Sequence, residues 1–227
     1  MAKSKRAVAN SNKKYVGKQQ EFNIVDFTET FLYTPTQRKK HVVLEAKNPT
    51  QEAYIRLLNN DNNKIIFATG PAGTGKTLLA CQAAVRALQE KSVNKIIVTR
   101  PAVTVDEDHG FLPGTLQEKM APWTRPIFDV FYEYWSPKHV EYMIENNIIE
   151  ISPLAYMRGR TFKNAFIVAD EMQNATVSQT KMLLTRLGDY SRMVVTGDLA
   201  QSDREKEESG LEDFISLYKA CLLYTSP

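Results

Sequence analysis

The feature that most constrains this chain is an apolar run that leads directly into a glycine-rich segment. Residues 65–69 read IIFAT, and residues 70–77 read GPAGTGKT. Five mostly apolar or β-branched residues, bounded by Asn and Asp before and Gly-Pro after, predict a strand buried on both faces of a sheet. The second segment matches the phosphate-loop pattern G-x-x-x-x-G-K-[ST] at every fixed position. A helix predicted over residues 75–89 completes the strand, loop and helix that phosphate binding requires.

Each residue type in the glycine-rich segment has a physical reason in phosphate binding. Glycines let backbone N–H groups turn inward to form an anion nest, and the following helix directs its positive dipole end toward it. Lys76 is expected to reach the β- and γ-phosphates, and the Thr77 hydroxyl to bind Mg²⁺. The alternative is a glycine-rich turn without a ligand. The predicted nucleotide-binding residues of this segment are Gly70, Pro71, Ala72, Gly73, Thr74, Gly75, Lys76, Thr77 and Leu78.

Further apolar segments predict more strands of the same sheet. Residues 95–99 read KIIVT, so strand, helix and strand form a βαβ unit with parallel strands. Residues 165–169 read AFIVA and deliver Asp170 and Glu171 to the carboxyl edge of the sheet. We expect Asp170 to help Thr77 hold Mg²⁺ and Glu171 to polarise a water for attack on the γ-phosphate, although Glu171 as an ordinary surface residue is the alternative.

The remaining elements are predicted from apolar spacing and from helix signals. A strand over residues 193–196 would bring Asp198 and Gln201 near the γ-phosphate, and another is predicted over 148–151. Short helices are predicted from about residue 49, near 139–145, and over 178–187 with a stop at Gly188. The amphipathic segment 116–135 contains Pro122 and Pro126, which should break or kink it. Its aromatic residues favour a core-facing helix over base stacking: Trp123, Phe128, Phe131, Tyr132 and Trp135.

Composition and charge narrow the class of protein. The chain has 227 residues, 43% of them apolar, which suits one α/β domain with an appendage. It contains no apolar run of the roughly 18 residues that span a bilayer, and its first residues do not resemble a secretion signal, so we expect a cytoplasmic protein without a membrane partner. Cys81 and Cys221 suggest neither a metal site nor a disulfide, and Cys81 is expected in the core.

The N-terminal residues carry a separate charge pattern. Residues 1–20 contain six basic residues and no acidic residue, with little to bury, which predicts a disordered basic tail. Such a tail can bind nucleic acid through phosphates or can serve only for solubility. Residues 21–47 read as an extension or linker, and the nucleotide-binding domain is predicted over 48–220. Residues 221–227 are interpreted as a truncated or non-native end.

Together these segments resemble the PhoH family of ATP-binding proteins, whose core is similar to the first RecA-like domain of superfamily 1 helicases. The phosphate loop and the acidic strand are shared by many NTPases. The segments that are typical of PhoH are FLPG at residues 111–114 and YMRGR at 156–160, supported by DEMQN at 170–174 and SGL at 209–211. Asp106, Glu107, Asp108 and His109 depart from the family's usual Gly-Glu pair before the FLPG loop.

The resemblance implies a RecA-like P-loop NTPase fold, a three-layer sandwich with a mostly parallel sheet. It implies ATP as the nucleotide, with Gln51 contacting adenine and Gln201 acting as a γ-phosphate sensor that couples hydrolysis to nucleic-acid binding. Gln51 could instead be only a polar residue at the start of a helix. Arg100 would border a single strand, although it could equally be structural. The basic N-terminal arm and the lack of an attached nuclease domain resemble the short phage or bacterial type of this phosphate-starvation-inducible family.

The function expected from this resemblance is Mg²⁺-dependent ATP hydrolysis by Lys76, Asp170, Glu171 and Gln201, coupled to RNA or single-stranded DNA. One alternative is a nucleotide-dependent switch that acts on protein partners. A small-molecule kinase fits the acidic segments less well, and a nucleotide bound without hydrolysis stays open. Because the chain carries one RecA-like domain, a homo-oligomeric ring is expected, in which a neighbouring copy donates an arginine. The candidates are Arg158, Arg160 and Arg186, each of which could instead be an ordinary surface or loop arginine.

Overall fold

The computed structural model describes residues 40–101, 116–201 and 209–216, without the side chains of 116–123. These residues belong to the second of two units, which divide between residues 38 and 39. The predicted basic tail, the segment around the FLPG loop and the predicted non-native end lie outside the described residues. The described residues thus cover most of the predicted nucleotide-binding domain.

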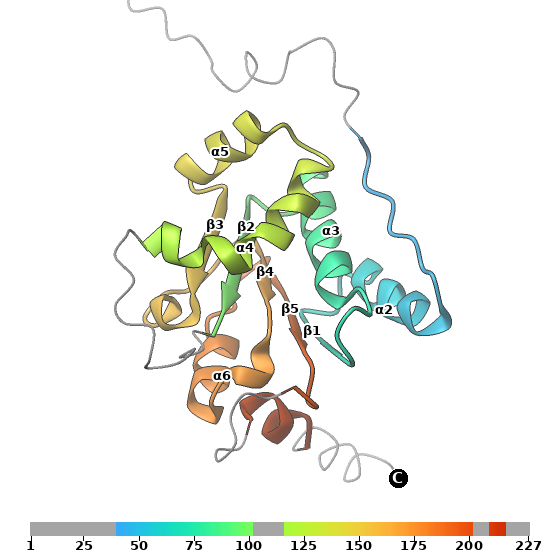
Figure 1. Cartoon of the computed structure of the whole chain (residues 1–227), viewed down its shortest axis with the longest axis vertical. Helices are drawn as coiled ribbons and strands as arrows, with labels where there is room; N and C mark the ends of the chain where they lie inside the picture. The colour runs from blue at the N-terminus through green and yellow to red at the C-terminus, as the bar shows by residue number, and fades with distance from the viewer. Residues whose placement is uncertain (1–39, 102–115, 202–208, 217–227) are drawn as a thin grey trace, which may run out of the picture. The chain divides into compact units, whose positions relative to one another are not determined.

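A five-stranded parallel sheet forms the centre of the domain (Figure 1). Its spatial order is β1-β5-β4-β2-β3, and each pair of neighbouring strands is parallel. Because the strands are parallel, all their carboxyl ends lie at the same edge, where the polar segments follow. The strands are β1 (Ile65–Thr69), β2 (Lys95–Arg100), β3 (Ile149–Pro153), β4 (Ala165–Ala169) and β5 (Arg192–Gly197).

Helices cover both faces of the sheet. Because successive residues of a strand point to opposite sides, each strand contributes apolar side chains to both faces. Val98, Val168 and Val194 belong to one core cluster, whereas Ile97, Ile167 and Val195 belong to another. The first cluster is covered by α2 (Pro49–Asn59), α3 (Lys76–Gln89), α4 (Leu116–Tyr132) and α5 (Pro137–Glu145). The second is covered by the short helices η2 (Leu154–Met157) and η3 (Met172–Asn174), by α6 (Val177–Leu184), and by helical residues 210–216. The predicted α/β three-layer sandwich with a parallel sheet is confirmed.

Helices α4 and α6 differ most from their predicted bounds. Helix α4 runs as one helix across Pro122 and Pro126, so of the predicted break or kink no break occurs, and it ends at Tyr132. Loss of backbone hydrogen bonds at a proline costs about 3 kcal/mol, and burial of Ile127 and Phe131 in the first core cluster offsets this cost. Helix α6 ends at Leu184, three residues early.

The early end of α6 has a local cause. The backbone N–H of Arg186 bonds back to the Leu183 carbonyl, while the Arg186 carbonyl accepts the Phe162 N–H at 2.9 Å. A parallel bridge then joins Phe162 and Leu187. The segment before Gly188 is therefore drawn out of the helix by pairing with a distant part of the chain, which the sequence pattern does not reveal.

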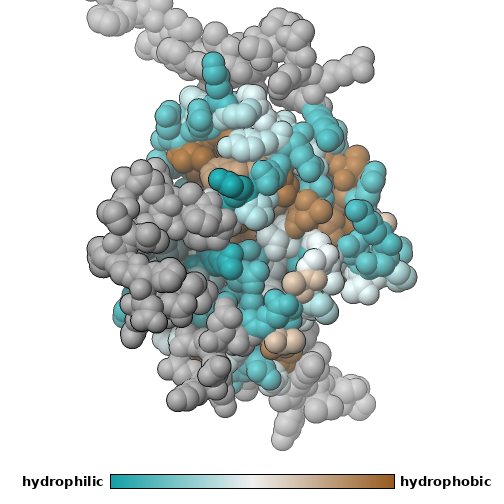
Figure 2. Space-filling view, viewed as in Figure 1, coloured by the Kyte–Doolittle hydropathy of each residue, from teal (hydrophilic) through white to brown (hydrophobic). Residues whose placement is uncertain are grey.

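The described aromatic residues in and just after α4 lie mainly in the core, as predicted, whereas the side chain of Trp123 lies outside the described residues. Phe131 is fully buried, and Phe128 and Trp135 pack against the same cluster, whereas Tyr132 is 43% exposed. The visible face of the domain is largely hydrophilic, with apolar patches over the region of α3, α4 and α5 (Figure 2). Cys81 is also buried, and this burial raises the pKa of its thiol. None of the helices in the described ranges is both long and apolar enough to cross a membrane.

Candidate nucleotide-binding site

The phosphate loop joins β1 to α3 and is shaped by its glycines. Gly73 and Gly75 have φ angles of 74° and 82°, in the left-handed region that other residues rarely adopt. Gly75 is the residue before the first helical residue of α3, so the loop runs directly into the helix N-terminus. The N–H of Gly70 bonds to the Gly197 carbonyl at 3.2 Å, which fastens the start of the loop to β5.

The side chain of Lys76 folds back over the loop from the first turn of α3. Its ammonium group donates to the carbonyl oxygens of Gly70 and Pro71, each at 2.7 Å, and lies 3.3 Å from the Thr74 hydroxyl oxygen. Its positive charge is thus held at the loop, together with the positive end of the helix dipole. An anion bound at this loop would be attracted by the Lys76 ammonium group and by the N-terminus of α3.

Asp170 lies where β4, β5 and the phosphate loop meet. Its Oδ1 atom accepts hydrogen bonds from two hydroxyls, that of Thr77 at 2.7 Å and that of Thr196 at 2.6 Å. Asp170 is 7% exposed, and its backbone N–H bonds to the Thr99 carbonyl. The two predicted metal ligands, Thr77 and Asp170, are therefore adjacent, and hydroxyl and carboxylate oxygens are ligands that suit Mg²⁺.

Glu171 turns the chain sharply away from the end of β4. Its backbone is left-handed, with φ 52° and ψ 40°, which costs a non-glycine residue about 1–2 kcal/mol. Its Oε2 atom accepts a hydrogen bond from the side-chain amide of Gln173. Within the part of the chain that the structure describes, Oε1 has no hydrogen-bond partner. Glu171 is half-buried and lines the same cavity as Asp170.

Asp198 connects the end of β5 to the phosphate loop. Its Oδ2 atom accepts the N–H of Ala72, and its Oδ1 atom accepts the N–H of Ala200, both at 3.0 Å. Asp198 is 6% exposed. The N–H of Gln201 bonds to the Asp198 carbonyl, which closes the turn that carries Gln201. In this structure Asp198 thus holds the loop backbone.

A cavity of about 280 Å³ lies between these elements at the carboxyl edge of the sheet. The structure brings together most of the predicted site residues here and adds Thr196 and Gly197, which were not predicted. Its lining consists of Ala72, Gly73, Gly75, Lys76, Thr77, Leu78, Asp170, Glu171, Thr196, Gly197, Asp198 and Gln201. The predicted residues Gln51, Gly70, Pro71 and Thr74 do not line it, although all four contact or belong to the loop.

Helix α2 supports the loop from outside the cavity. The Gln51 amide donates to the Thr74 carbonyl at 3.0 Å and accepts the Lys47 N–H at 2.7 Å. The Tyr54 hydroxyl donates to the Lys76 carbonyl at 3.3 Å, and burial raises the pKa of this phenol. Contact of Gln51 with adenine stays a prediction.

The arginines proposed from sequence differ in their surroundings. Arg160 pairs with Glu150 through both guanidinium nitrogens and lies 4.6 Å over the Phe162 ring. This hydrogen-bonded pair holds the pKa of Glu150 below its usual range. Arg186 donates to the carbonyls of Met182 and Arg160. Both are committed to contacts within the chain, whereas Arg158 is exposed.

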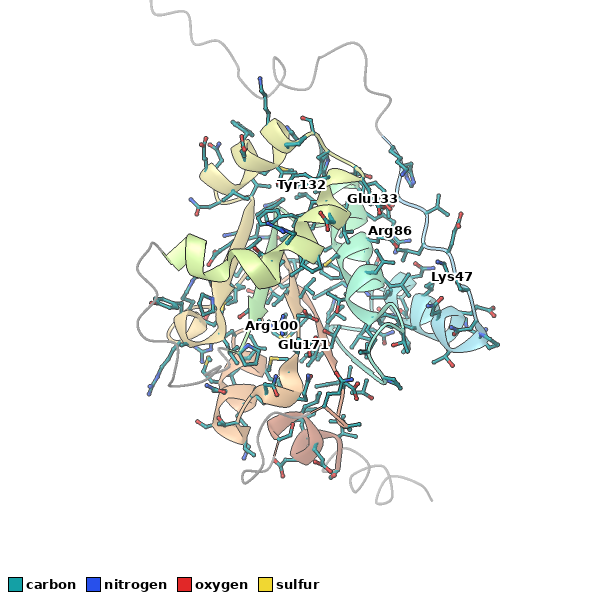
Figure 3. All side chains as sticks on the ribbon, in the orientation of Figure 1. Lys47, Arg86, Arg100, Tyr132, Glu133 and Glu171 are labelled. Atoms are coloured by element: carbon teal, nitrogen blue, oxygen red, sulfur yellow. The ribbon has the colours of Figure 1, made fainter. Side chains whose placement is uncertain are left out.

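Arg100 ends β2 beside the acidic strand. Figure 3 shows Arg100 and Glu171 at the same end of the sheet, with Tyr132 and Glu133 at the opposite end. The Arg100 side chain is half-buried. Contact of Arg100 with a nucleic-acid strand stays a prediction.

Comparison with models of known protein families shows the family to which this chain belongs. The model of the family described as PhoH-like protein matches residues 43–222. The chain belongs to the PhoH-like protein family. It is 45% identical over 197 residues to a PhoH-like protein of Synechocystis, covering 86% of this chain and 58% of the relative.

Two other PhoH relatives give the same result. A PhoH-like protein of Mycobacterium bovis is 52% identical over 160 residues, covering 70% of this chain and 45% of the relative. Protein PhoH of Escherichia coli K12 is 44% identical over 177 residues, with 77% and 49% covered. The PhoH-like chain described here thus spans about half the length of the curated relatives it matches.

Among solved structures, the PhoH-like domain is similar to the SWI2/SNF2 ATPase core of Sulfolobus solfataricus in complex with double-stranded DNA. The TM-score is 0.44 at 16% sequence identity, and the match covers 71% of this chain and 34% of that chain.

Proposed function

We propose that this PhoH-like domain binds ATP with Mg²⁺ and hydrolyses it, in connection with RNA or single-stranded DNA. The observation that carries the proposal is the contact of Thr77 with Asp170 beside Glu171, in one cavity with Lys76. A phosphate loop, a pair of hard oxygen ligands and a carboxylate beside them are the groups that nucleotide hydrolysis requires.

Each group has a distinct role in the proposed reaction. The N–H groups of the loop and the ammonium of Lys76 bind phosphate oxygens and offset their charge. Thr77 and Asp170 would hold Mg²⁺, which, when bound, neutralises charge that develops on the transferred phosphoryl group. Glu171 accepts a proton from water at its Oε1 atom as that water attacks the γ-phosphorus, the bond to the β–γ bridging oxygen breaks, and ADP leaves. Gln201, which lines the cavity on the turn after β5, would respond to the γ-phosphate.

The small number of protein ligands for Mg²⁺ fits a metal ion that binds together with the nucleotide. Within the described ranges, no group of three or more His, Cys, Asp or Glu side chains could hold an ion by itself. Mg²⁺ in nucleotide sites usually takes only one or two protein ligands and completes its shell with phosphate oxygens and water. The pair Thr77 and Asp170 fits that pattern.

Phosphate release by the purified protein tests the proposal. With ATP and Mg²⁺ we expect steady turnover that EDTA abolishes, and single-stranded RNA or DNA should raise kcat. Turnover that no nucleic acid changes would favour the switch that acts on protein partners. Absence of phosphate release with Mg²⁺ and nucleic acid present would overturn hydrolysis, and transfer of phosphate only to a small hydroxyl compound would favour a kinase.

A further inference from the structure

Gln173 joins the two acidic segments of the site through one side-chain amide. It lies in the short helix η3, two residues after Glu171, and is 2% exposed. Its Nε2 group donates to Glu171 Oε2, and its Oε1 atom accepts the N–H of Asp198 at 3.0 Å. The amide therefore connects the segment after β4 to the turn after β5.

The chemistry of the two neighbours fixes the orientation of this amide. An ionised carboxylate only accepts hydrogen bonds, and a backbone N–H only donates. One of the two amide orientations satisfies both neighbours, and the reverse orientation satisfies neither. A glutamine at residue 173 can make both contacts. A glutamate could still accept from Asp198 but would place a second carboxylate against Glu171.

Close packing on the other side limits movement of the amide. A Cβ atom added to Gly197 would lie 3.0 Å from Gln173 Oε1 and 3.3 Å from its backbone nitrogen. The same Cβ would lie 2.5 Å from Leu211 Cδ2. The end of β5 thus passes between Gln173 and Leu211 with room only for glycine, and the side chain of Gln173 is held against both acidic segments.

We propose that Gln173 is a positioning residue that orients the Glu171 carboxylate and links it to the turn of Asp198 and Gln201. The proposal rests on the proposed hydrolysis at this site. By occupying Oε2, the Gln173 amide leaves Oε1 to face the attacking water, in a geometry that the left-handed backbone of Glu171 alone does not secure. A shift of the turn that carries Gln201 would be passed to Glu171 through the same amide.

The first test is Gln173→Glu, which preserves size and the contact with Asp198 but loses the donor to Glu171. We expect kcat for ATP to fall roughly ten- to a hundredfold, the usual scale for removing a partner that orients a reacting group. The Kd for ATP should change by less than about twofold, because the variant leaves the phosphate loop intact. Gln179→Glu is the matched control, since Gln179 caps α6 and glutamate serves equally at that position.

A double-mutant cycle separates positioning from a general structural role. Gln173→Leu should lower kcat in the wild-type background and have no further effect in the Glu171→Gln background, because both changes remove the same function. A further loss of kcat in the Glu171→Gln background would overturn the proposal. So would full kcat in Gln173→Glu, or a fall in ATP affinity and Tm with kcat unchanged. A wild-type protein that binds ATP without turnover would instead overturn the proposed hydrolysis.

Discussion

Thr196 was not among the predicted site residues, but its side chain contacts the predicted metal ligand Asp170. Its hydroxyl is almost fully buried and donates to the same Asp170 oxygen that accepts the Thr77 hydroxyl. Two donors on one oxygen fix the rotamer of the carboxylate and leave Oδ2 for other partners. Thr196→Val keeps the shape and removes one of these donors.

We therefore expect Thr196→Val to require more Mg²⁺ for half-maximal ATP turnover, by roughly ten- to a hundredfold, as when other groups that orient metal ligands are removed. Mg²⁺ titration of the ATPase rate measures this. Thr185→Val is the control, since the Thr185 hydroxyl bonds to the Met182 carbonyl on the exposed end of α6. An unchanged Mg²⁺ requirement in Thr196→Val would show that Thr77 alone suffices to orient Asp170.

Among single residues, the sequence predicted those that belong to a continuous motif. It missed those whose role depends on contacts between segments that are distant in the sequence. Lys76 and Thr77 follow from the spacing of the loop, and Asp170 from the apolar run before it. Thr196 was inside a predicted strand, but its contact with Asp170 depends on β5 lying beside β4. Gln173 lies two residues from Glu171, yet its contact with Asp198 joins segments 25 positions apart.

At the scale of the elements, the end of β5 is tightly enclosed on two sides. Gly197 packs between η3 and helical residues 210–216, and a methyl group there would overlap Leu211. Gly197→Ala should lower the free energy of unfolding by about 1–3 kcal/mol, the usual cost of overpacking. Urea unfolding measures it.

A second substitution tests the cause of that loss. Leu211→Val removes the methyl group that would collide with a new Cβ, so its combination with Gly197→Ala should destabilise the domain by less than the sum of the single changes. Additive destabilisation would place the cost of Gly197→Ala in the backbone of β5. Unchanged stability in Gly197→Ala would show that helical residues 210–216 move aside freely.

The elements themselves were predictable to different degrees. The buried strands were found within one or two residues, because continuous apolar runs with polar ends mark them clearly. The two helix errors have tertiary causes. Pairing of Arg186 and Leu187 with Phe162 ends α6 early, and core burial of Ile127 and Phe131 holds α4 across its prolines.

At the scale of the whole molecule, the parallel sheet collects the groups of the site from three separate strands. The order β1-β5-β4 places the phosphate loop, the turn of Asp198 and the acidic pair side by side, although they span residues 70–201. The head-to-tail ring stays a prediction. Of its three candidate arginines, Arg160 and Arg186 are held within the chain, and Arg158 is the exposed one.

The most direct test of the account compares ATP binding and ATP turnover in Lys76→Ala and Glu171→Gln. Lys76 offsets phosphate charge in the bound state, so Lys76→Ala should abolish detectable ATP binding and turnover together. Glu171 acts on the attacking water, so Glu171→Gln should bind ATP as the wild type does and lose turnover by roughly a hundredfold or more. Equal loss of ATP affinity in both variants would contradict the account, because Glu171 would then be a binding or structural residue.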